Sequence, residues 1–449
     1  MNENAQNNDK NDYNDKQSKK QGFRQRYVEN YKKYSFIGLA ICIAILPFIF
    51  IPAFSENLKY YDAYHFPKFI FLFPLTMYIS LMYFAGRLLE GNFKLSSITK
   101  IEYPFYIMLL WLIFSTILSP HKDLVFTGFL VRHQGFATII SYLLLFYIGF
   151  KTCKREYVEK YMRMILILSI PLSIYGILQY FNIEFLPRDN YHIGRVAALS
   201  TFGNRNFTAS YASLMLGFAT IQYIRTKKNI DLMISAILFA LLIATQTRGA
   251  WLGSGFAFIV TAIVFRHFLK ENLKQVVTLS IAFIIILGLF NLDSRTNSRF
   301  ASFSNEVKKI TSADASQTES LGSGRGIIYL ETLKILPQFM IIGSGPDTFS
   351  KSFNQEAWRE YRNNEGALVN DAHSEYLHIW VTKGFPFLLA YLILLLFILK
   401  AHYRNRKKSM NIVLFCGLLA YISQASFNIA IIGIAPIFWA TLGMNDWEG

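Results

Sequence analysis

The sequence predicts an all-α polytopic membrane protein with about twelve transmembrane helices and one large extracytoplasmic loop that contains short helices. Three observations support this fold class. Of the 449 residues, 53% are hydrophobic and only 16% are charged, whereas a soluble domain has about 25% charged residues. Apolar runs long enough to cross a bilayer recur along the chain. Basic residues cluster in short segments between these runs, as they do in the cytoplasmic loops of membrane proteins.

Twelve apolar runs mark the predicted helices, with boundaries good to a few residues. They lie at 36–54, 69–86, 104–118, 136–150, 164–183, 207–224, 232–247, 250–265, 275–292, 385–399, 411–426 and 430–443.

The distribution of lysine and arginine predicts the orientation of these helices. Alternate gaps are strongly basic, and short loops with such a bias face the cytoplasm. We therefore expect both termini inside, in the cytoplasmic membrane of a bacterium. The basic segments lie at 18–33, 151–163, 225–228, 266–274 and 400–408, and the gaps expected outside lie at 55–68, 119–135, 184–206, 246–250, 293–384 and 427–429.

This pattern divides the chain into four parts. Residues 1–33 are polar and rich in Asn, Asp and Lys, so we expect a disordered cytoplasmic tail. Residues 34–292 hold helices one to nine, residues 293–384 form the large external loop, and residues 385–449 hold helices ten to twelve.

Charge and cysteine content exclude two classes of function. The net charge of +16 is spread over the ends of many helices rather than over one face, so we expect no nucleic-acid partner. The cysteines are Cys42, Cys153 and Cys416; two lie in apolar runs, so neither a disulfide framework nor a metal cluster is expected.

Arg248 lies in the tight turn 246–250, between the seventh and eighth helices. In the interpretation without a functional role, its side chain reaches the membrane interface, with Trp251 as an interfacial residue. Its functional interpretation is an anion site, because a guanidinium group can hold two phosphate oxygens.

Arg325 lies in the glycine-rich stretch 322–326, ahead of an apolar helical run. Glycines before a helix let backbone N–H groups approach an anion, and the helix dipole adds positive charge. A flexible linker before a surface helix is the simpler interpretation.

The sequence NDAHSEYLHIW closes the large loop at residues 370–380. His373 is suited to proton exchange near neutral pH, and either Asp371 or Glu375 could orient its ring. A lone histidine is more often a surface or packed residue, so both interpretations stay open at this point.

Taken in order, several segments resemble the O-antigen ligase and polymerase superfamily of bacterial membrane glycosyltransferases. The segments are GNRNF, TQTRGAWLG, GSGRG, IIGSGPDTF and NDAHSEYLHIWVTKG. Family members carry a G-N-x-N motif before a span, a T-x-S/T-R-G turn, an arginine at the start of a large external loop and an A-H-x-x-Y/F-L motif at its end. The resemblance covers roughly residues 130–400, and the layout of spans and loop is also similar.

The resemblance assigns roles to residues in these motifs. Arg248 and Arg325 would bind the diphosphate of the donor, and His373 would act as the catalytic base. Asn204 and Asn206 match the two asparagines of the first motif and would contribute to substrate binding.

Two positions depart from the family pattern. Arg205 replaces the proline that often stands between the two asparagines, and Ser374 follows His373 where asparagine is common.

The reaction implied by the resemblance is transfer of a glycan from an undecaprenyl-diphosphate carrier to an acceptor hydroxyl at the outer face of the membrane. The acceptor would be a glycan, a lipid or a cell-wall polymer, and membrane lipids would surround the protein. The transfer is expected to invert the anomeric centre and to need no cofactor or metal. The external loop carries no Asp-x-Asp pair that could hold a divalent ion, so arginines would supply the positive charge.

Two alternatives remain. A polymerase would extend the lipid-linked glycan with the same cationic cleft, and sequence patterns do not separate it from a ligase. A transporter or flippase fits the number of spans, but transporters usually show two related halves and ionisable residues deep in the spans. The predicted spans contain essentially no Asp, Glu or His, which favours the enzyme.

Overall fold

The computed structural model describes residues 2–52, 63–91, 98–187, 198–311 and 321–444. Every regular element in these ranges is a helix, which confirms the predicted all-α class. The elements are α1 (Asn2–Ile45), η1 (Leu46–Phe48), α3 (Phe66–Glu90), α4 (Glu102–Leu118), α5 (Phe136–Thr152), α6 (Arg155–Tyr180), η3 (Ser200–Phe202), α7 (Arg205–Thr226), α8 (Asn229–Ala244), α9 (Arg248–Val264), α10 (Arg266–Glu271), α11 (Leu273–Asn291), α12 (Ser294–Thr311), α13 (Leu321–Ile335), η5 (Leu336–Phe339), α14 (Phe349–Ser352), α15 (Gln355–Arg362), α16 (Glu375–Lys383), α17 (Phe385–Arg404), α18 (Ser409–Gln424) and α19 (Ala435–Gly443).

Each of the twelve predicted apolar runs coincides with one of these helices over most of its length. By length and composition, five helices in the described part of the chain could cross a membrane, at residues 24–48, 66–90, 155–180, 273–291 and 385–404. Five shorter apolar helices are α4, α5, α8, α9 and α18. The count of twelve crossings stays a prediction.

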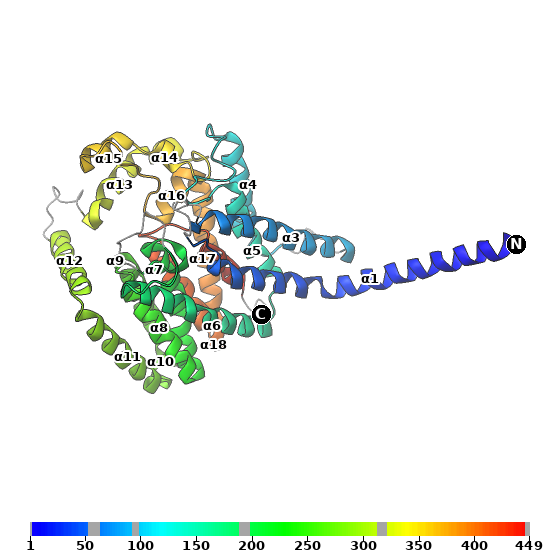
Figure 1. Ribbon diagram of the computed structural model, residues 1–449, viewed down its shortest axis with the longest axis horizontal. Coiled ribbons are helices and arrows are strands. Elements are labelled where there is room, and N and C mark those ends of the chain that lie inside the picture. Colours follow the sequence, from blue (N-terminus) through cyan, green and yellow to red (C-terminus); the bar gives the residue numbers. More distant parts are fainter. Residues whose placement is uncertain (1, 53–62, 92–97, 188–197, 312–320, 445–449) are drawn as a thin grey trace.

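The N-terminal helix α1 includes the segment for which we expected a disordered tail. Residues 2–33 are helical in the structure and continue into the apolar run. The segment contains no proline, so no residue in it breaks the helical hydrogen bonds. Figure 1 shows this helix projecting from the body of the molecule.

Helices α7 and α18 form the centre of the body. Nearly every residue of both helices is buried, as expected for helices that are apolar or small on all sides. A Cβ atom on Gly217 would lie 2.6 Å from the Cα atom of Gly417. The two glycines therefore let the backbones of α7 and α18 approach closely, as small residues do between membrane helices. By contrast, α11 lies at the edge of the body (Figure 1) and buries only Leu279 and Phe290.

The segments that connect the helices form two groups according to their contacts. In one group, the 119–135 segment contacts residues 344–347, the turn 246–250 contacts the start of α7, and residues 427–428 contact both α7 and α13. In the other group, ion pairs join the basic gaps to acidic residues near them, namely Lys151–Glu102, Arg163–Asp231 and Arg225–Glu159. Segments that were expected on the same side of the membrane thus contact one another. The side of the membrane that each group faces stays a prediction.

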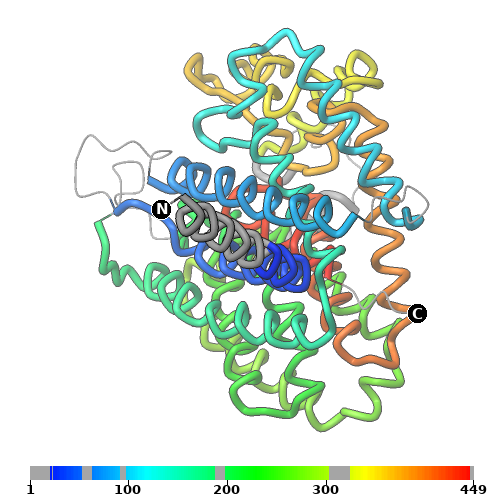
Figure 2. The backbone as a smooth tube through the Cα atoms, turned by 90° about the vertical axis from the view of Figure 1, so that its right-hand side faces the viewer, coloured from blue at the N-terminus to red at the C-terminus, as the bar shows by residue number. Residues whose placement is uncertain are grey.

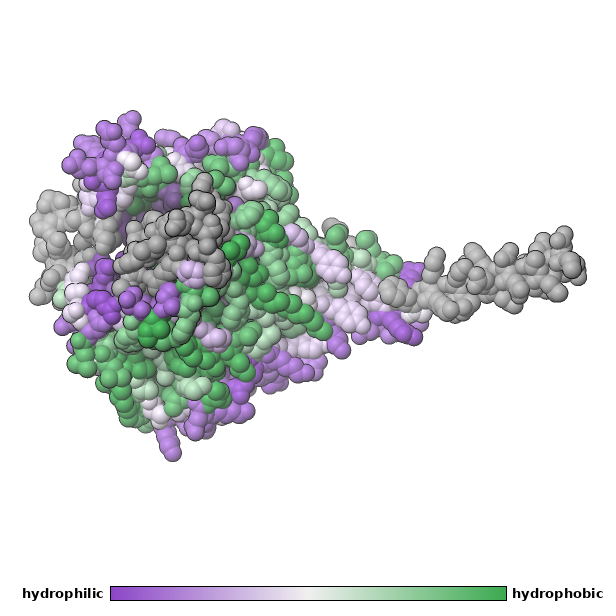
Figure 3. All heavy atoms as spheres, viewed as in Figure 1, coloured by the Kyte–Doolittle hydropathy of each residue, from purple (hydrophilic) through white to green (hydrophobic). Residues whose placement is uncertain are grey.

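The region 293–384 contains the short helices that we predicted. Helices α13 to α16 surround a small hydrophobic core that is separate from the main core of the molecule. This small core consists of Ile327, Ile328, Leu336, Phe349, Phe353, Val369, Ala372 and Val381. In Figure 2 the cyan segment after α4 lies beside these yellow and orange helices at one end of the molecule. Figure 3 shows hydrophilic residues gathered over α13–α15 and hydrophobic residues over much of the body below them. The extracytoplasmic position of this region stays a prediction.

Candidate active site

His373 lies just before α16, in the left-handed region of backbone conformation (φ 48°). Its backbone N–H donates to Asp371 Oδ1 over 2.8 Å, and its ring Nδ1 lies 3.0 Å from the same oxygen. The strained backbone is thus compensated by a carboxylate that holds both the main chain and the ring. With Nδ1 directed at Asp371, Nε2 is the nitrogen that can meet a reacting group. The side chain of His373 is 33% exposed, so such a group can reach it.

Asp371, and not Glu375, is the carboxylate that orients this ring. Burial alone would raise the pKa of Asp371, but the charges of His373 and Arg132 and the hydrogen bond from His373 hold it below its usual range. Asp371 is therefore ionised at neutral pH. Arg132 Nη1 lies 3.2 Å from its second oxygen, Oδ2.

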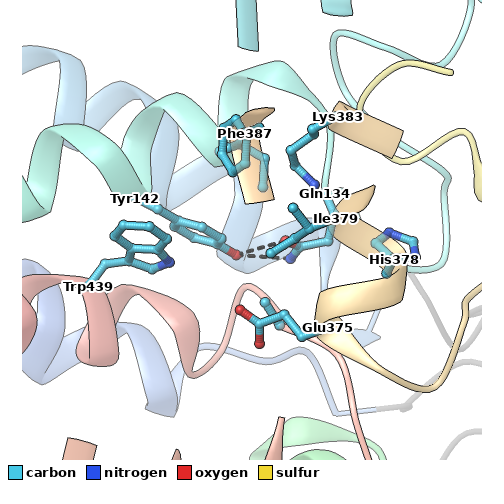
Figure 4. A pocket seen from close by; sticks show the side chains of 10 residues that line it. Gln134, Tyr142, Glu375, His378, Ile379, Lys383, Phe387 and Trp439 are labelled. Atoms are coloured by element: carbon cyan, nitrogen blue, oxygen red, sulfur yellow. Dashed lines mark hydrogen bonds between the residues drawn. The ribbon is translucent and has the colours of Figure 1, made fainter. Parts of the chain in front are cut away.

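Glu375 points away from His373 into the protein. It accepts hydrogen bonds from the hydroxyls of Tyr391 (3.0 Å) and Tyr421 (3.4 Å). Burial raises its pKa to about 7. Figure 4 shows Glu375 and Tyr142 directed into one small cavity of about 40 Å³, which is large enough for a few water molecules. Its lining consists of Gln134, Ile139, Tyr142, Glu375, His378, Ile379, Lys383, Phe387, Ala430 and Trp439.

Arg325 lies on α13, next to the loop that carries His373. Its Nη1 donates to the carbonyl oxygen of Phe427 over 2.7 Å. One turn further along α13, the hydroxyl of Tyr329 donates to the carbonyl oxygen of His373 over 3.1 Å. Because residues four apart share one face of a helix, α13 presents Arg325 on the face that contacts the loop of His373. The glycines around Arg325 lie within the first turns of α13 and not ahead of it.

Arg248 is the first residue of α9, so this helix begins two residues before the predicted run 250–265, within the predicted turn 246–250. Its Nη1 donates to Ser302 Oγ of α12 over 2.9 Å. The next residue, Gly249, lies against Phe427, because a Cβ atom at this position would be 2.5 Å from Phe427 Cβ. Phe427 also accepts the hydrogen bond from Arg325, and Ala425 accepts the backbone N–H of Glu375. The segments that carry Arg248, Arg325 and His373 therefore meet around residues 425–427.

Asn204 and Asn206 both make contacts within the protein. Asn204 caps α7, because its Oδ1 accepts the backbone N–H of Asn206 over 2.8 Å. Asn206 Oδ1 accepts from Thr247 Oγ1 over 3.3 Å, and its carbonyl oxygen accepts from Asn428 Nδ2 over 2.8 Å. Asn206 therefore ties the start of α7 to the start of α9. The role of both asparagines in substrate binding stays a prediction.

Two further arginines join this surface, and sequence analysis assigned neither to the site. Arg205 lies close to Arg248, Arg299 and Arg325. Burial and then the charges of these three residues lower the pKa of Arg205. Arg205 could have been recognised from its place between the two asparagines, whereas Arg299 on α12 has no distinctive motif. Within the described ranges, neither Arg205 nor Arg299 forms an ion pair. The N-terminal ends of helices α7 and α9 add the positive ends of their helix dipoles to this surface. The arrangement is suited to an anion with several charges.

Comparison with protein families matches residues 233–392 to the family described as O-antigen ligase. The matched segment includes Arg248, Arg325 and His373 but not Asn204 or Asn206. A comparison with curated proteins gave no match. The match and the apolar helices indicate a bacterial membrane protein and an enzyme of the glycosyltransferase or ligase type. The similarity of this chain to the O-antigen ligase family therefore extends over residues 233–392, which is less than half of its length.

Proposed function

We propose that this protein transfers a glycan from an undecaprenyl-diphosphate carrier to an acceptor hydroxyl at the outer face of the cytoplasmic membrane. The observation that carries the proposal is the placement of His373, with its ring held by Asp371, beside a surface that carries Arg248 and Arg325. A base and an anion site side by side are what this transfer needs.

The arginines would act on the leaving group. As the bond between the anomeric carbon and the phosphate oxygen breaks, negative charge develops on the diphosphate. Arg248 and Arg325 would stabilise this charge, because charge-assisted hydrogen bonds from guanidinium to phosphate are strong. Arg205 and Arg299 would add to the positive potential around them. Arginines that supply this charge remove the need for a divalent metal ion.

His373 would act on the acceptor. Its Nε2 would take the proton of the acceptor hydroxyl while the oxygen attacks the anomeric carbon from the side opposite to the leaving phosphate. A new bond forms between the acceptor oxygen and this carbon, the bond to the phosphate breaks, and undecaprenyl diphosphate leaves. The anomeric configuration is inverted. Asp371 stabilises the imidazolium ion that results, as a buried carboxylate does beside a catalytic histidine.

The test is complementation of a deletion strain in the producing bacterium, followed by mass analysis of carrier-linked and acceptor-linked glycan. Wild-type protein restores acceptor-linked glycan. His373→Ala and Arg325→Ala are expected to reduce it at least 100-fold, because each removes a group that acts in the transition state, while the protein still accumulates in the membrane. Arg359→Ala in the exposed helix α15 is the matched control and is expected to behave as wild type. Purified enzyme is expected to keep its activity in EDTA.

The outcome of this experiment also separates ligase from polymerase. A ligase deletion leaves long glycan on the carrier, whereas a polymerase deletion leaves single repeat units. Normal acceptor-linked glycan in the His373→Ala strain would contradict its role as the base.

A further inference from the structure

A buried chain of charged groups leads away from His373 into the protein. Asp371 Oδ2 lies 3.2 Å from Arg132 Nη1, and Arg132 Nη2 lies 2.7 Å from Asp347 Oδ1. The side chain of Arg132 is only 2% exposed and that of Asp347 is fully buried. These residues come from three segments, at 132, 347 and 371–373, which only the fold brings together.

The end of this chain of charged groups that lies farthest from His373 is Asp347, and backbone groups hold it in place. Asp347 Oδ2 accepts the backbone N–H groups of Phe129 (2.7 Å) and Gln134 (3.0 Å). The turn that carries Asp347 is itself fastened to α16, because the N–H groups of Ser344 and Gly345 donate to carbonyl oxygens at the end of that helix. Arg132 is therefore held between a fixed carboxylate and the carboxylate that contacts His373.

The charges along the chain do not balance. Among the groups in direct contact, two carboxylates face one guanidinium group, which leaves one excess negative charge beside the imidazole. Uptake of a proton by His373 cancels this charge. The other charged and titratable groups around these side chains are Glu375, His378 and Lys383 on α16, Arg325 and Tyr329 on α13, His65 and Lys68 at the start of α3, His133 next to Arg132, and Tyr142 on α5.

We propose that Arg132 and Asp347 are positioning residues for His373. They hold Asp371 ionised and in one orientation, so that the ring presents Nε2 to the acceptor and gains a proton at low cost. Neither residue contacts substrate. The proposal rests on the role of His373 as base, given above, and it goes further by assigning a function to two buried residues that had no role in the sequence analysis.

A purely structural role would predict a different result. A buried ion pair is weak support for stability, and loss of one partner destabilises the fold without changing the chemistry of a distant group. Asp347 makes no contact with His373 in the structure. A change at Asp347 that alters proton uptake by His373 would therefore show that the chain transmits charge and orientation.

Modification by diethyl pyrocarbonate measures proton uptake directly, because the reagent labels neutral imidazole. The full-length protein in detergent is labelled between pH 5 and pH 8, and the peptide that contains His373 is quantified by mass spectrometry. In Asp347→Asn, the pH of half-maximal labelling is expected to fall by roughly half a pH unit or more, because a negative charge that favours imidazolium is gone. Glu360→Gln on the exposed helix α15 removes the same charge elsewhere and is expected to leave the midpoint unchanged.

Arg132→Lys separates geometry from charge. Lysine keeps the positive charge, but a single ammonium group does not reproduce the two-pronged bridge between Asp347 and Asp371. The labelling midpoint is expected to stay within about 0.2 of the wild-type value, since the net charge is unchanged. The kcat of glycan transfer is expected to fall roughly tenfold or more, with KM unchanged, because the ring is misplaced.

Two results would overturn the proposal. One is an Asp347→Asn protein that accumulates normally and keeps the wild-type labelling midpoint. The other is an Arg132→Lys enzyme with wild-type kcat. The labelling needs no substrate, so a failure of the proposed function, seen as absence of transfer by the wild-type protein, is distinguishable from a failure of this inference.

Discussion

At the residue scale, the charged side chains of the site differ in how they are compensated. His373 contacts a buried carboxylate and can therefore carry a positive charge in the reaction. Arg205 lies instead among three other arginines, partly buried, where repulsion and desolvation both oppose its charge. A bound polyanion would relieve this repulsion. This crowding of positive charge supports the proposed binding of a diphosphate carrier.

Glu375 makes the free energy of unfolding depend on pH. Its pKa is about 7 in the folded protein and about 4.3 in an unfolded chain. Between these values the folded protein keeps a proton that the unfolded chain loses, so stability falls as pH rises through this window and changes no further above it. The effect is at most about 4 kcal/mol.

We therefore expect the unfolding temperature of the protein in detergent to be lower at pH 7.5 than at pH 5. Glu375→Gln is expected to remove most of this difference, and Glu360→Gln, at an exposed position on α15, is expected to keep it. Differential scanning fluorimetry measures both. An equal pH dependence in wild type and Glu375→Gln would show that Glu375 does not hold the proton.

At the scale of elements, the site depends on where helices end rather than on their lengths. Helices α7 and α9 begin at an arginine, α13 carries Arg325 in its first turns, and α16 begins two residues after His373. The short segment after α18 holds these ends together, through Phe427 to α13 and α9 and through Asn428 to α7. A shift of one helix end therefore disturbs several functional groups at once.

Two glycines of α9 test this arrangement. A Cβ atom on Gly249 would lie 2.5 Å from Phe427 Cβ, whereas nothing lies within 4 Å of a Cβ atom on Gly255. Gly249→Ala is expected to push α9 away from Phe427 and to lower glycan transfer roughly tenfold or more. Gly255→Ala adds the same methyl group in the same helix and is expected to keep wild-type activity, with stability raised by up to about 1 kcal/mol.

Transfer by both variants, measured at equal amounts of protein in the membrane, checks this expectation. Equal activity in the two alanine variants would show that contact between α9 and Phe427 does not position the site.

At the scale of the whole molecule, function depends on which end faces outward. The candidate site lies with the gaps expected outside, and the basic gaps lie in the opposite group. The exposed apolar faces of helices such as α11 would meet lipid. A lipid-linked donor could then reach the arginines from the plane of the membrane.

Cysteine labelling in intact cells tests this orientation. Glu360 on α15 and Lys407 after α17 are both exposed. In a background with Cys153→Ser, a membrane-impermeant maleimide is expected to label Glu360→Cys in intact cells and Lys407→Cys only after the cytoplasmic membrane is opened. The remaining cysteines, Cys42 and Cys416, are buried and serve as an internal control. The reverse pattern would place His373 in the cytoplasm and contradict the proposed function.

Much of the fold was predictable because helix formation in a membrane protein depends on local composition. A run such as 69–86 must satisfy its own backbone hydrogen bonds in lipid, and a helix is the structure that does so. The tight turn at 246–250 was predictable for the same reason, since polar residues separate two apolar runs there. The helical state of residues 2–33 was not expected, because a polar segment carries no apolar periodicity by which to recognise it.

The candidate site was predictable in part. Arg248, Arg325 and His373 stand out because charged residues are rare in this chain and these three occur in recognisable motifs. The sequence analysis assigned no role to Arg132 or Asp347. Their importance depends on partners more than 200 positions away in the sequence.

The sequence by itself determined the all-helical architecture and the three candidate residues, because apolar runs and short motifs can be recognised from neighbouring residues alone. Only the tertiary structure decided that Asp371 holds His373 while Glu375 turns to two tyrosines, and that Arg132 bridges two carboxylates. The physical reason is that pairing of buried charges depends on how distant segments pack, and side chains a few residues apart in sequence can face opposite environments once they are packed.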